Sequence, residues 1–289
     1  MATRKAFGVA LSPAGIDGVS QLMKGRRALV LSGAGISTES GIPDYRGPRS
    51  AARSVRPIHY REFVGSPQSR ARYWARSAVG WPRVSEARPN PGHVAIARME
   101  ESGAVIGVIT QNVDRLHQAA GSSRVVELHG TLTDVVCLEC GSREQRQQLQ
   151  DRLLLLNPEW AKEQYQAAVM APDGDAQVEV PADGSFRVPA CLRCSGVLKP
   201  DVVFFGENVP RTRVEQALSL LEEAEVLLVV GSSLAVYSGY RFAVQAHEES
   251  KPVAIINLGP CRADALAAVR IETALSEALP RLAELLGIA

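Results

Sequence analysis

Four cysteines fall into two pairs with the spacing of metal ligands, Cys137 with Cys140 and Cys191 with Cys194. Two Cys-x-x-Cys pairs supply the four thiolates of a closed tetrahedral zinc site, although the stretch between these pairs is longer than in the usual zinc ribbon. Because four thiolates leave no open position on the metal, we predict one structural Zn²⁺ that takes no part in catalysis. Cys261 is left over and is interpreted as a small buried or edge residue.

A row of polar side chains, Gln111, Asn112 and Asp114, follows the apolar run 105–109, and His129 follows the short run 125–128. In doubly wound sheets, ligands bind where parallel strands end. A histidine with a pKa near neutrality beside such groups suits a general base for a sugar hydroxyl. Taken alone, a single histidine at a strand end is more often structural than catalytic. The other histidines give no functional signal, and His93 is interpreted as a cap or packing residue.

Gly33 and Gly35 follow the apolar run 28–32, at the predicted start of a helix. Glycines there let the main chain approach a pyrophosphate, and free N–H groups at a helix N-terminus favour the anion. This pattern predicts a dinucleotide site. We expect that a Cβ at either glycine would collide with the phosphates of the ligand. The fingerprint is incomplete, because Ser37 follows Gly35 and an arginine-rich segment stands where an acidic residue is usual. An ordinary tight turn is the alternative.

Two later apolar runs end in the same kind of residue. Gly231, Ser232 and Ser233 follow the run 226–230, and Asn257, Leu258 and Gly259 follow the run 253–256. Each turn alone is equally typical of an ordinary strand-to-helix connection. Together with the other strand ends they are most simply explained by one extended ligand.

The elements that position these residues predict an α/β fold, a doubly wound parallel Rossmann-like sheet with a second, smaller zinc-binding module. The runs 28–32, 105–109, 226–230 and 253–256 are continuously apolar or nearly so and alternate with helical patterns, which is typical of a parallel sheet covered on both faces. We expect the main sheet to resume at 202–205, and proline residues to make a turn region of 82–91. The first helix is expected to start at Ser12 and Pro13 and to end at Gly25.

Composition narrows the classes of partner. The chain is 46% hydrophobic and 22% charged, which is ordinary for a globular protein, and its formal net charge of +1 predicts neither nucleic acid nor anionic membrane as a partner. The opening is too short for a secretory signal, and no run reaches the roughly 18 apolar residues that span a membrane. We expect a cytoplasmic protein, and its oligomeric state stays open.

Residues 33–46, which end in Asp44, Tyr45 and Arg46, resemble the cofactor-loop signature of the sirtuins, the NAD-consuming protein deacylases. The resemblance covers about residues 17–280. Its other carriers are Gln111-Asn112-Val113-Asp114, His129-Gly130, the two cysteine pairs, the stretch 199–207, Gly231-Ser232-Ser233 and Asn257. The resemblance implies an NAD-binding domain of residues 1–46, 92–134 and 197–289, a cofactor loop and helical part at 47–91, and a zinc module at 135–196.

The resemblance also implies a reaction. Acylated lysine side chains of proteins lie in a cleft between the two units, the acyl oxygen displaces nicotinamide from NAD, and the acyl group passes to ADP-ribose. His129 deprotonates a ribose hydroxyl, Asn112 and Gln111 hold the ribose and water, and Asp114 receives the nicotinamide amide. The remaining NAD contacts are implied for Gly33, Ala34, Gly35, Ser37, Asp44, Tyr45, Arg46, Gly231, Ser232, Ser233, Asn257, Leu258 and Gly259.

Tyr45 stands where most of the family has Phe as a shield over the nicotinamide pocket, and we expect its ring to keep that role. Val202 and Phe204 belong to a segment that the resemblance implies pairs with the substrate main chain. Further stretches resemble the class II branch, and there Tyr73 and Arg76 resemble the pair by which desuccinylase-type sirtuins receive an acidic acyl group. Three residues apart on a helix, both project from one face. Packing of Tyr73 and solvation of Arg76 is the alternative.

Three functions remain open from the sequence. The first is an NAD-dependent protein-lysine deacylase, for which we hypothesise a preference for acidic acyl groups. The second is an NAD-dependent protein ADP-ribosyltransferase, and the third is an inactive zinc-bearing binding module. The presence of His129, Asn112 and Asp114 together disfavours the third.

Overall fold

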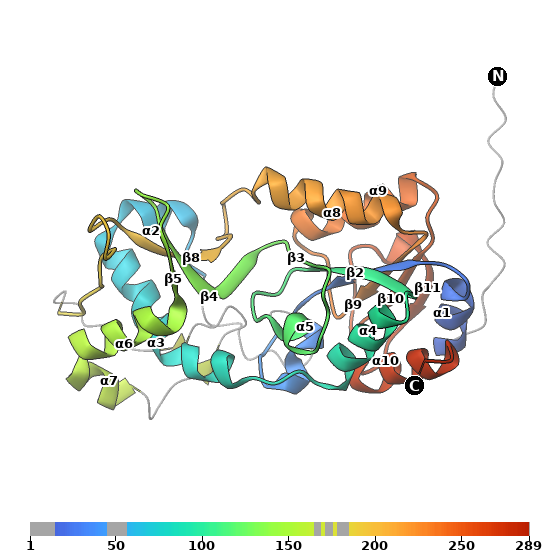
Figure 1. The fold of residues 1–289 in the computed structure, drawn as a ribbon, viewed down its shortest axis with the longest axis horizontal. Coiled ribbons are helices and arrows are strands. Elements are labelled where there is room, and N and C mark those ends of the chain that lie inside the picture. The colour runs from blue at the N-terminus through green and yellow to red at the C-terminus, as the bar shows by residue number, and fades with distance from the viewer. Residues whose placement is uncertain (1–14, 45–56, 165–168, 171–175, 178–184, 289) are drawn as a thin grey trace, which may run out of the picture.

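Six parallel strands form the sheet that carries the larger part of the molecule (Figure 1). This computed structural model describes residues 15–44, 57–164, 169–170, 176–177 and 185–288. The strand order is β11-β10-β9-β1-β2-β3, and every neighbouring pair is parallel. The chain thus moves outward from β1 to β3 and then outward on the other side from β9, which confirms the predicted doubly wound sheet. The bounds are β1 Ala28–Ser32, β2 Val105–Thr110, β3 Val125–Glu127, β9 Val226–Val230, β10 Val253–Ile256 and β11 Ala267–Ile271.

Helices cover both faces of this sheet because alternate strand residues point to opposite sides. Val30 and Leu228 pack in one core with residues of α1, α4 and α10, whereas Leu29 and Leu227 pack in the other with residues of α8 and α9. In Figure 1 α4 and α10 lie below the sheet, α1 lies at its right-hand end, and α8 and α9 lie above it. The bounds are α1 Ile16–Met23, α4 Pro91–Glu101, α8 Arg211–Glu223, α9 Tyr237–Glu248 and α10 Leu275–Leu285.

A three-stranded antiparallel sheet, with the order β5-β4-β8, forms the centre of the smaller part at the left of Figure 1. The prediction that the main sheet resumes at 202–205 is wrong, because β8 ends at Val202 and pairs with β4. The apolar run is explained by packing, since Phe204 stacks on Phe63 in the core of the smaller part. The bounds are β4 Gly130–Cys137, β5 Arg143–Gln145, β8 Leu198–Val202, α2 Tyr60–Gly65, α3 Pro67–Glu86, α6 Arg146–Leu156 and α7 Pro158–Gln164.

Pro82 lies inside α3 and does not start a turn, which corrects the sequence prediction. A proline within a helix leaves the carbonyl four residues earlier without its usual N–H donor. Here that carbonyl belongs to Ala78, and the side-chain amide of Gln150 on α6 donates to it at 2.7 Å. The guanidinium of Arg146 donates similarly to the Ser77 carbonyl at 3.1 Å. Side chains of the zinc module therefore allow α3 to continue through the proline.

Several sequence predictions cannot be compared in full. Ser12, Pro13 and residues 45–56 of the arginine-rich segment fall outside the described residues, and the described first helix begins at Ile16. The short α5 Leu116–Ala119 follows the Asp114 turn, and two short strands, β6 Val169–Met170 and β7 Ala176–Gln177, pair with each other. The predicted domain boundaries stay a prediction; β4 begins at Gly130, before the predicted start of the zinc module.

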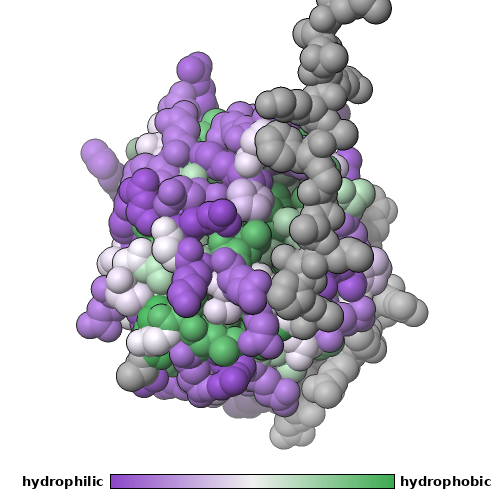
Figure 2. Space-filling view, turned by 90° about the vertical axis from the view of Figure 1, so that its right-hand side faces the viewer, coloured by the Kyte–Doolittle hydropathy of each residue, from purple (hydrophilic) through white to green (hydrophobic). Residues whose placement is uncertain are grey.

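Within the described residues, none of the helices combines the length and apolar character needed to cross a membrane. Figure 2 views the end of the molecule that carries α1 and the C-terminus. Hydrophilic side chains dominate the part of this face that is not covered by grey atoms, and hydrophobic atoms occupy smaller areas between them.

Candidate active site

A cavity of about 750 Å³ opens at the carboxyl ends of the central strands. Its walls come from the turns after β1, β2, β3, β9 and β10 and from the segment 202–209 that follows β8. The chain order reverses between β1 and β9, and ligands of doubly wound sheets bind at such a reversal. The predicted residues that line it are Gly33, Ala34, Gly35, Ser37, Asp44, Tyr73, Gln111, Asn112, Asp114, His129, Val202, Phe204, Gly231, Ser232, Ser233, Asn257 and Leu258.

The glycine turn is held against the turn after β9. The Gly35 N–H donates to the Gly231 carbonyl at 2.8 Å, and a Cβ on Gly35 would lie 2.9 Å from the Gly231 Cα. A Cβ on Gly33 would lie 2.7 Å from the Ser232 Oγ. The glycines are therefore required for close contact between the turns after β1 and β9. The sequence predicted instead that a Cβ would collide with the phosphates of a bound dinucleotide. This close contact places main-chain groups without side chains at the wall of the cavity.

The helix predicted after Gly35 is absent. Residues Ala34–Ile36 and Thr38–Ser40 form two short 3₁₀ turns, separated at Ser37 and ended by the left-handed Gly41. The macrodipole of an α-helix therefore contributes nothing here. Asn90, which caps α4, also donates to the Ile36 carbonyl at 2.6 Å and fixes the turn from behind.

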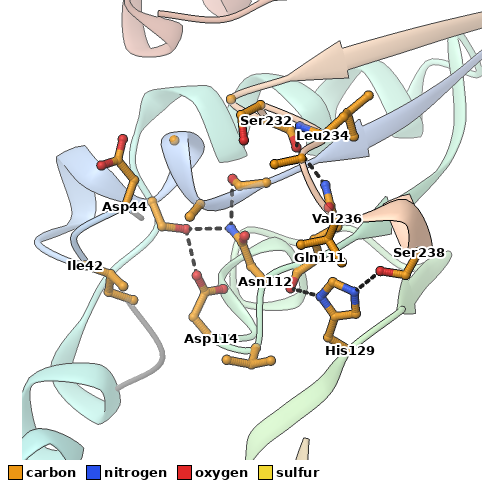
Figure 3. A pocket seen from close by; sticks show the side chains of 18 of the residues that line it. Ile42, Asp44, Gln111, Asn112, Asp114, His129, Ser232, Leu234, Val236 and Ser238 are labelled. Carbon is orange, nitrogen blue, oxygen red and sulfur yellow. Dashed lines mark hydrogen bonds between the residues drawn. The ribbon is translucent and has the colours of Figure 1, made fainter. Parts of the chain in front are cut away.

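Asn112, Ser37 and Asp114 form a chain of hydrogen bonds across the cavity (Figure 3). The Asn112 Nδ2 donates to the Ser37 Oγ at 3.1 Å, and that hydroxyl donates to the Asp114 Oδ2 at 2.7 Å. Asn112 also donates to the Gly33 carbonyl at 3.1 Å, which identifies the nitrogen of its amide. Burial raises the pKa of Asp114, and hydrogen bonds from Leu116 and Ser37 offset part of that rise. These bonds bring together the turns after β1 and β2.

His129 lies at the edge of this chain with both ring nitrogens engaged. Its Nδ1 lies 3.0 Å from the Gln111 carbonyl oxygen and its Nε2 lies 2.8 Å from the Ser238 Oγ. Burial of the ring lowers the pKa of His129, the bond to Gln111 raises it, and the charge of Arg213 lowers it further. The lowered pKa favours the neutral, basic form at neutral pH. The sequence assigned no role to Ser238, whose stretch 236–240 only resembles the class II branch, since its contact with His129 depends on how α9 packs.

Gln111 joins the polar row to the far wall. Its side-chain amide donates to the Ser232 Oγ at 2.8 Å and to the Ser32 carbonyl at 3.2 Å. Asn257 turns its own amide back to the Gly259 carbonyl at 3.0 Å. Leu258 and Ser233 line the cavity, whereas Gly259 is not among its described lining residues. Tyr45 and Arg46 lie outside the described residues.

The opposite wall is aromatic and apolar. Tyr73 is 4% exposed and makes edge contacts with Phe63, Trp74 and Phe204. Arg76, one turn further along α3, is buried too, but it is not among the described residues that line the cavity. The structure therefore brings only Tyr73 of this pair to the cavity wall.

The segment after β8 is fixed by an ion pair between a buried lysine and a half-buried glutamate, which the sequence prediction did not mark. The Lys199 Nζ lies 3.1 Å from a Glu207 oxygen and donates to the Val202 carbonyl at 2.5 Å. Glu207 accepts from the Phe204 N–H at 2.8 Å. Opposite charges with these main-chain partners hold the wall segment in place. Both residues belong to the stretch 199–207, but the sequence does not reveal their pairing.

Beneath the cavity, two histidines without a predicted function form a buried polar cluster. The His117 Nε2 lies 2.8 Å from the Ser32 Oγ, and the rings of His117 and His93 are 5.0 Å apart between centroids. Ser32 donates to the Thr110 Oγ1 at 2.9 Å, which accepts from the Asn112 N–H at 3.1 Å. Burial lowers the pKa of His93 to about 4 and that of His117 to about 3. His93 completes the capping box of α4, in which its Nδ1 accepts from the Asn90 N–H at 3.4 Å, in agreement with the prediction of a cap or packing residue.

The four paired cysteines converge as predicted. The Sγ atoms of Cys137, Cys140, Cys191 and Cys194 all lie within 4.8 Å of one another. Such a set of four thiols, two buried and two exposed, is suited to a structural zinc. Cys137 and Cys191 also belong to an apolar core that the zinc module shares with α2 and α3. Cys261 is 5% exposed, as predicted for a buried residue.

Comparisons with known proteins agree with this geometry. Residues 33–238 match the model of the Sir2 family. The NAD-dependent protein deacetylase of Bordetella bronchiseptica is 51% identical over 253 residues, 88% of this chain and 91% of that protein. The mitochondrial NAD-dependent protein lipoamidase sirtuin-4 of Bos taurus is 49% identical over 258 residues, 88% of this chain and 81% of that protein.

Solved structures are similar in fold over nearly the whole chain. Sir2 with a p53 peptide and NAD+ has a TM-score of 0.70 and 29% identity, and the match covers 95% of this chain and all of that one. Sir2 bound to a propionylated peptide has a TM-score of 0.74 and 30% identity, and covers 95% of this chain and 99% of that one.

Proposed function

The chain belongs to the Sir2 family, and from that premise we propose how its cavity carries out NAD-dependent deacylation of protein lysines. The enzyme is an NAD-dependent protein deacylase that uses NAD as a co-substrate and acylated lysine side chains of proteins as substrates. NAD supplies a ribose whose bond to nicotinamide is broken and whose ADP-ribose accepts the acyl group.

One observation carries the assignment of roles. The polar chain Asn112–Ser37–Asp114 and the ring of His129 reach the same cavity from the ends of β1, β2 and β3. A binding module has no need of a buried, neutral histidine in the same cavity as a carboxylate whose pKa is raised. We assign the general base to His129, because desolvation keeps its ring unprotonated at neutral pH.

Asn112 and Asp114 orient the ribose and the carboxamide of the bound NAD in this proposal. The Asn112 amide is fixed by the Gly33 carbonyl and the Ser37 hydroxyl, so that it presents a constant face to a ribose. Asp114, held by Ser37 and by the Leu116 N–H, is the acceptor for a carboxamide N–H. Preorganised polar groups of this kind cost no reorganisation when a ligand binds.

The glycine turns fit a dinucleotide. Gly33 and Gly35 lie against Gly231 and Ser232 with no space for a Cβ, so the wall at the strand ends is main chain. Main-chain N–H groups in such turns bind phosphate oxygens. Ser232 adds a hydroxyl to this wall, and Asn257 with Leu258 forms the part that we assign to the adenosine end.

The acyl-lysine lies between the segment 202–209 and the aromatic wall of α3 in this proposal. Tyr73 and Phe204 are supported as acyl contacts by their position on the cavity wall and by their mutual edge contact. The finer proposal is a preference for acidic acyl groups, in which the Tyr73 phenol and the Arg76 guanidinium receive a terminal carboxylate. Its support is their spacing on α3 and the burial of both side chains.

Product analysis tests the proposed function. Purified protein is incubated with NAD and an acetylated lysine peptide, and the products are measured by mass spectrometry. Deacylation yields nicotinamide, the deacylated lysine peptide and acyl-ADP-ribose in equal amounts. ADP-ribosylation, the alternative, also yields nicotinamide but adds ADP-ribose to a protein. Release of nicotinamide without acyl-ADP-ribose from any of a panel of acylated peptides would contradict the deacylase assignment.

A further inference from the structure

The hydroxyl of Ser238 lies on the reactive nitrogen of His129, 2.8 Å from Nε2 (Figure 3). We propose that Ser238 is a positioning residue for the general base, which holds the imidazole in one tautomer and one orientation before and after proton transfer. This inference rests on the proposed function, because it assigns a partner to the base of that reaction.

The tautomer follows from the other side of the ring. The Gln111 carbonyl oxygen, 3.0 Å from Nδ1, can only accept a hydrogen bond, so Nδ1 carries the proton. A neutral imidazole has a single N–H, so Nε2 has a lone pair and the Ser238 hydroxyl donates to it. The two bonds at opposite nitrogens fix the ring plane. Nε2 is thereby the basic atom that faces Ser238 on the cavity wall.

The fold places Ser238 there through Gly239. A Cβ on Gly239 would collide with the side-chain amide of Gln111, so glycine lets the first turn of α9 pack closely while Gln111 keeps its position. The same amide donates to Ser232, whose Oγ accepts from the Leu234 N–H at 3.2 Å. Gln111 therefore fixes both the base, through its carbonyl, and the segment that delivers Ser238.

The proton balance shows why a hydroxyl is suited to this position. When a ribose hydroxyl approaches, its hydrogen replaces that of Ser238 at the Nε2 lone pair. The proton then moves to Nε2, and the ribose oxygen keeps the electron pair of the broken O–H bond. The ring becomes a cation with two N–H groups. The rotated Ser238 hydroxyl can accept from Nε2–H while Gln111 still accepts from Nδ1–H, because a hydroxyl both donates and accepts.

Two variants of Ser238 test the inference. Ser238→Ala removes the hydroxyl, Ser238→Thr keeps it, and Ser102→Ala removes a serine hydroxyl that donates to the Met99 carbonyl at the end of α4. We expect kcat of Ser238→Ala to fall about 2- to 10-fold, the worth of one net hydrogen bond, with KM for NAD and peptide within about twofold. Ser238→Thr and Ser102→Ala should keep wild-type kcat.

A ¹⁵N spectrum of His129 in the ligand-free protein gives a second readout. Wild-type protein should show a protonated Nδ1 and an unprotonated, hydrogen-bonded Nε2, with the signals assigned by their loss in His129→Gln. The Nε2 resonance should move to higher frequency in Ser238→Ala and return in Ser238→Thr. An unmoved Nε2 resonance in Ser238→Ala, with or without a change in kcat, overturns the inference. If the wild-type enzyme deacylates no peptide, the proposed function fails, whereas the spectrum still tests the Ser238 contact.

Discussion

The Gly35 N–H donates a 2.8 Å hydrogen bond to the Gly231 carbonyl and so joins the turns after β1 and β9. Because a Cβ on Gly35 would lie 2.9 Å from the main chain of Gly231, Gly35→Ala must separate these turns. We expect a loss of stability of about 1–3 kcal/mol, typical of overpacking, and at least tenfold weaker NAD binding. Calorimetry of unfolding and of NAD binding measures both. Gly65→Ala, at the end of α2 with open space for a Cβ, is the matched control.

Because the four cysteine sulfurs converge on one site, we predict that replacing one of them removes the zinc and destabilises the smaller part. Cys191→Ser should bind less than one zinc per chain and unfold the smaller part at a lower temperature, because metal binding is coupled to folding. Elemental analysis and circular dichroism measure these two effects. Cys261→Ser, which changes a buried cysteine of the large core, should keep its zinc. Wild-type protein that is folded and free of zinc would contradict the prediction.

The buried pair His93 and His117 predicts sensitivity to acid. Burial lowers their pKa values from 6.5 to about 4 and about 3, so both stay neutral in the folded chain. Above pH 6.5 neither the folded nor the unfolded state takes up their protons, and these residues give no pH dependence. Below pH 6.5 these histidines bind protons in the unfolded chain but stay unprotonated in the folded chain. Stability should therefore fall with pH, by about 1.4 kcal/mol per pH unit for each histidine, until the folded pKa is reached.

Urea titrations between pH 7 and pH 4.5 measure this slope. His117→Asn should make it shallower, while it lowers stability at pH 7 by removing the contact with Ser32. His247→Asn, at an exposed position on α9, should leave the slope unchanged. An identical slope in wild type and His117→Asn would show that His117 does not cause the acid sensitivity.

Arg76 decides the proposed preference for acidic acyl groups. A charge-assisted hydrogen bond to a terminal carboxylate of about 1.5–3 kcal/mol corresponds to roughly ten- to hundredfold in kcat/KM. We expect succinyl-lysine to exceed acetyl-lysine as a substrate by that factor, and Arg76→Met to reverse the order. Arg72→Met, an exposed position on the same helix, is the control. Equal loss of both activities in Arg76→Met would show that Arg76 supports the fold alone.

The central strands of the main sheet could be predicted from the sequence because they are continuous apolar runs, buried on both faces. Strand β11 was not predicted, because Arg270 interrupts its apolar run. Residues 202–205 were assigned to the wrong sheet, because an apolar run does not indicate which sheet a strand joins. The glycines, the polar row and the cysteines were located by spacing. Ser238 was found only in the structure, because its bond to His129 depends on how two distant segments pack.

The general-base role of His129 is the central claim, and one pair of measurements on His129→Ala tests it most directly. Turnover of an acylated peptide with NAD is compared with the NAD dissociation constant of the same variant from calorimetry, and His247→Ala serves as the control. The account predicts that acyl transfer falls about 10²- to 10⁴-fold while the NAD dissociation constant changes little, because the imidazole acts on a ribose proton and is not a main binding contact. Turnover of His129→Ala near the wild-type rate would contradict it.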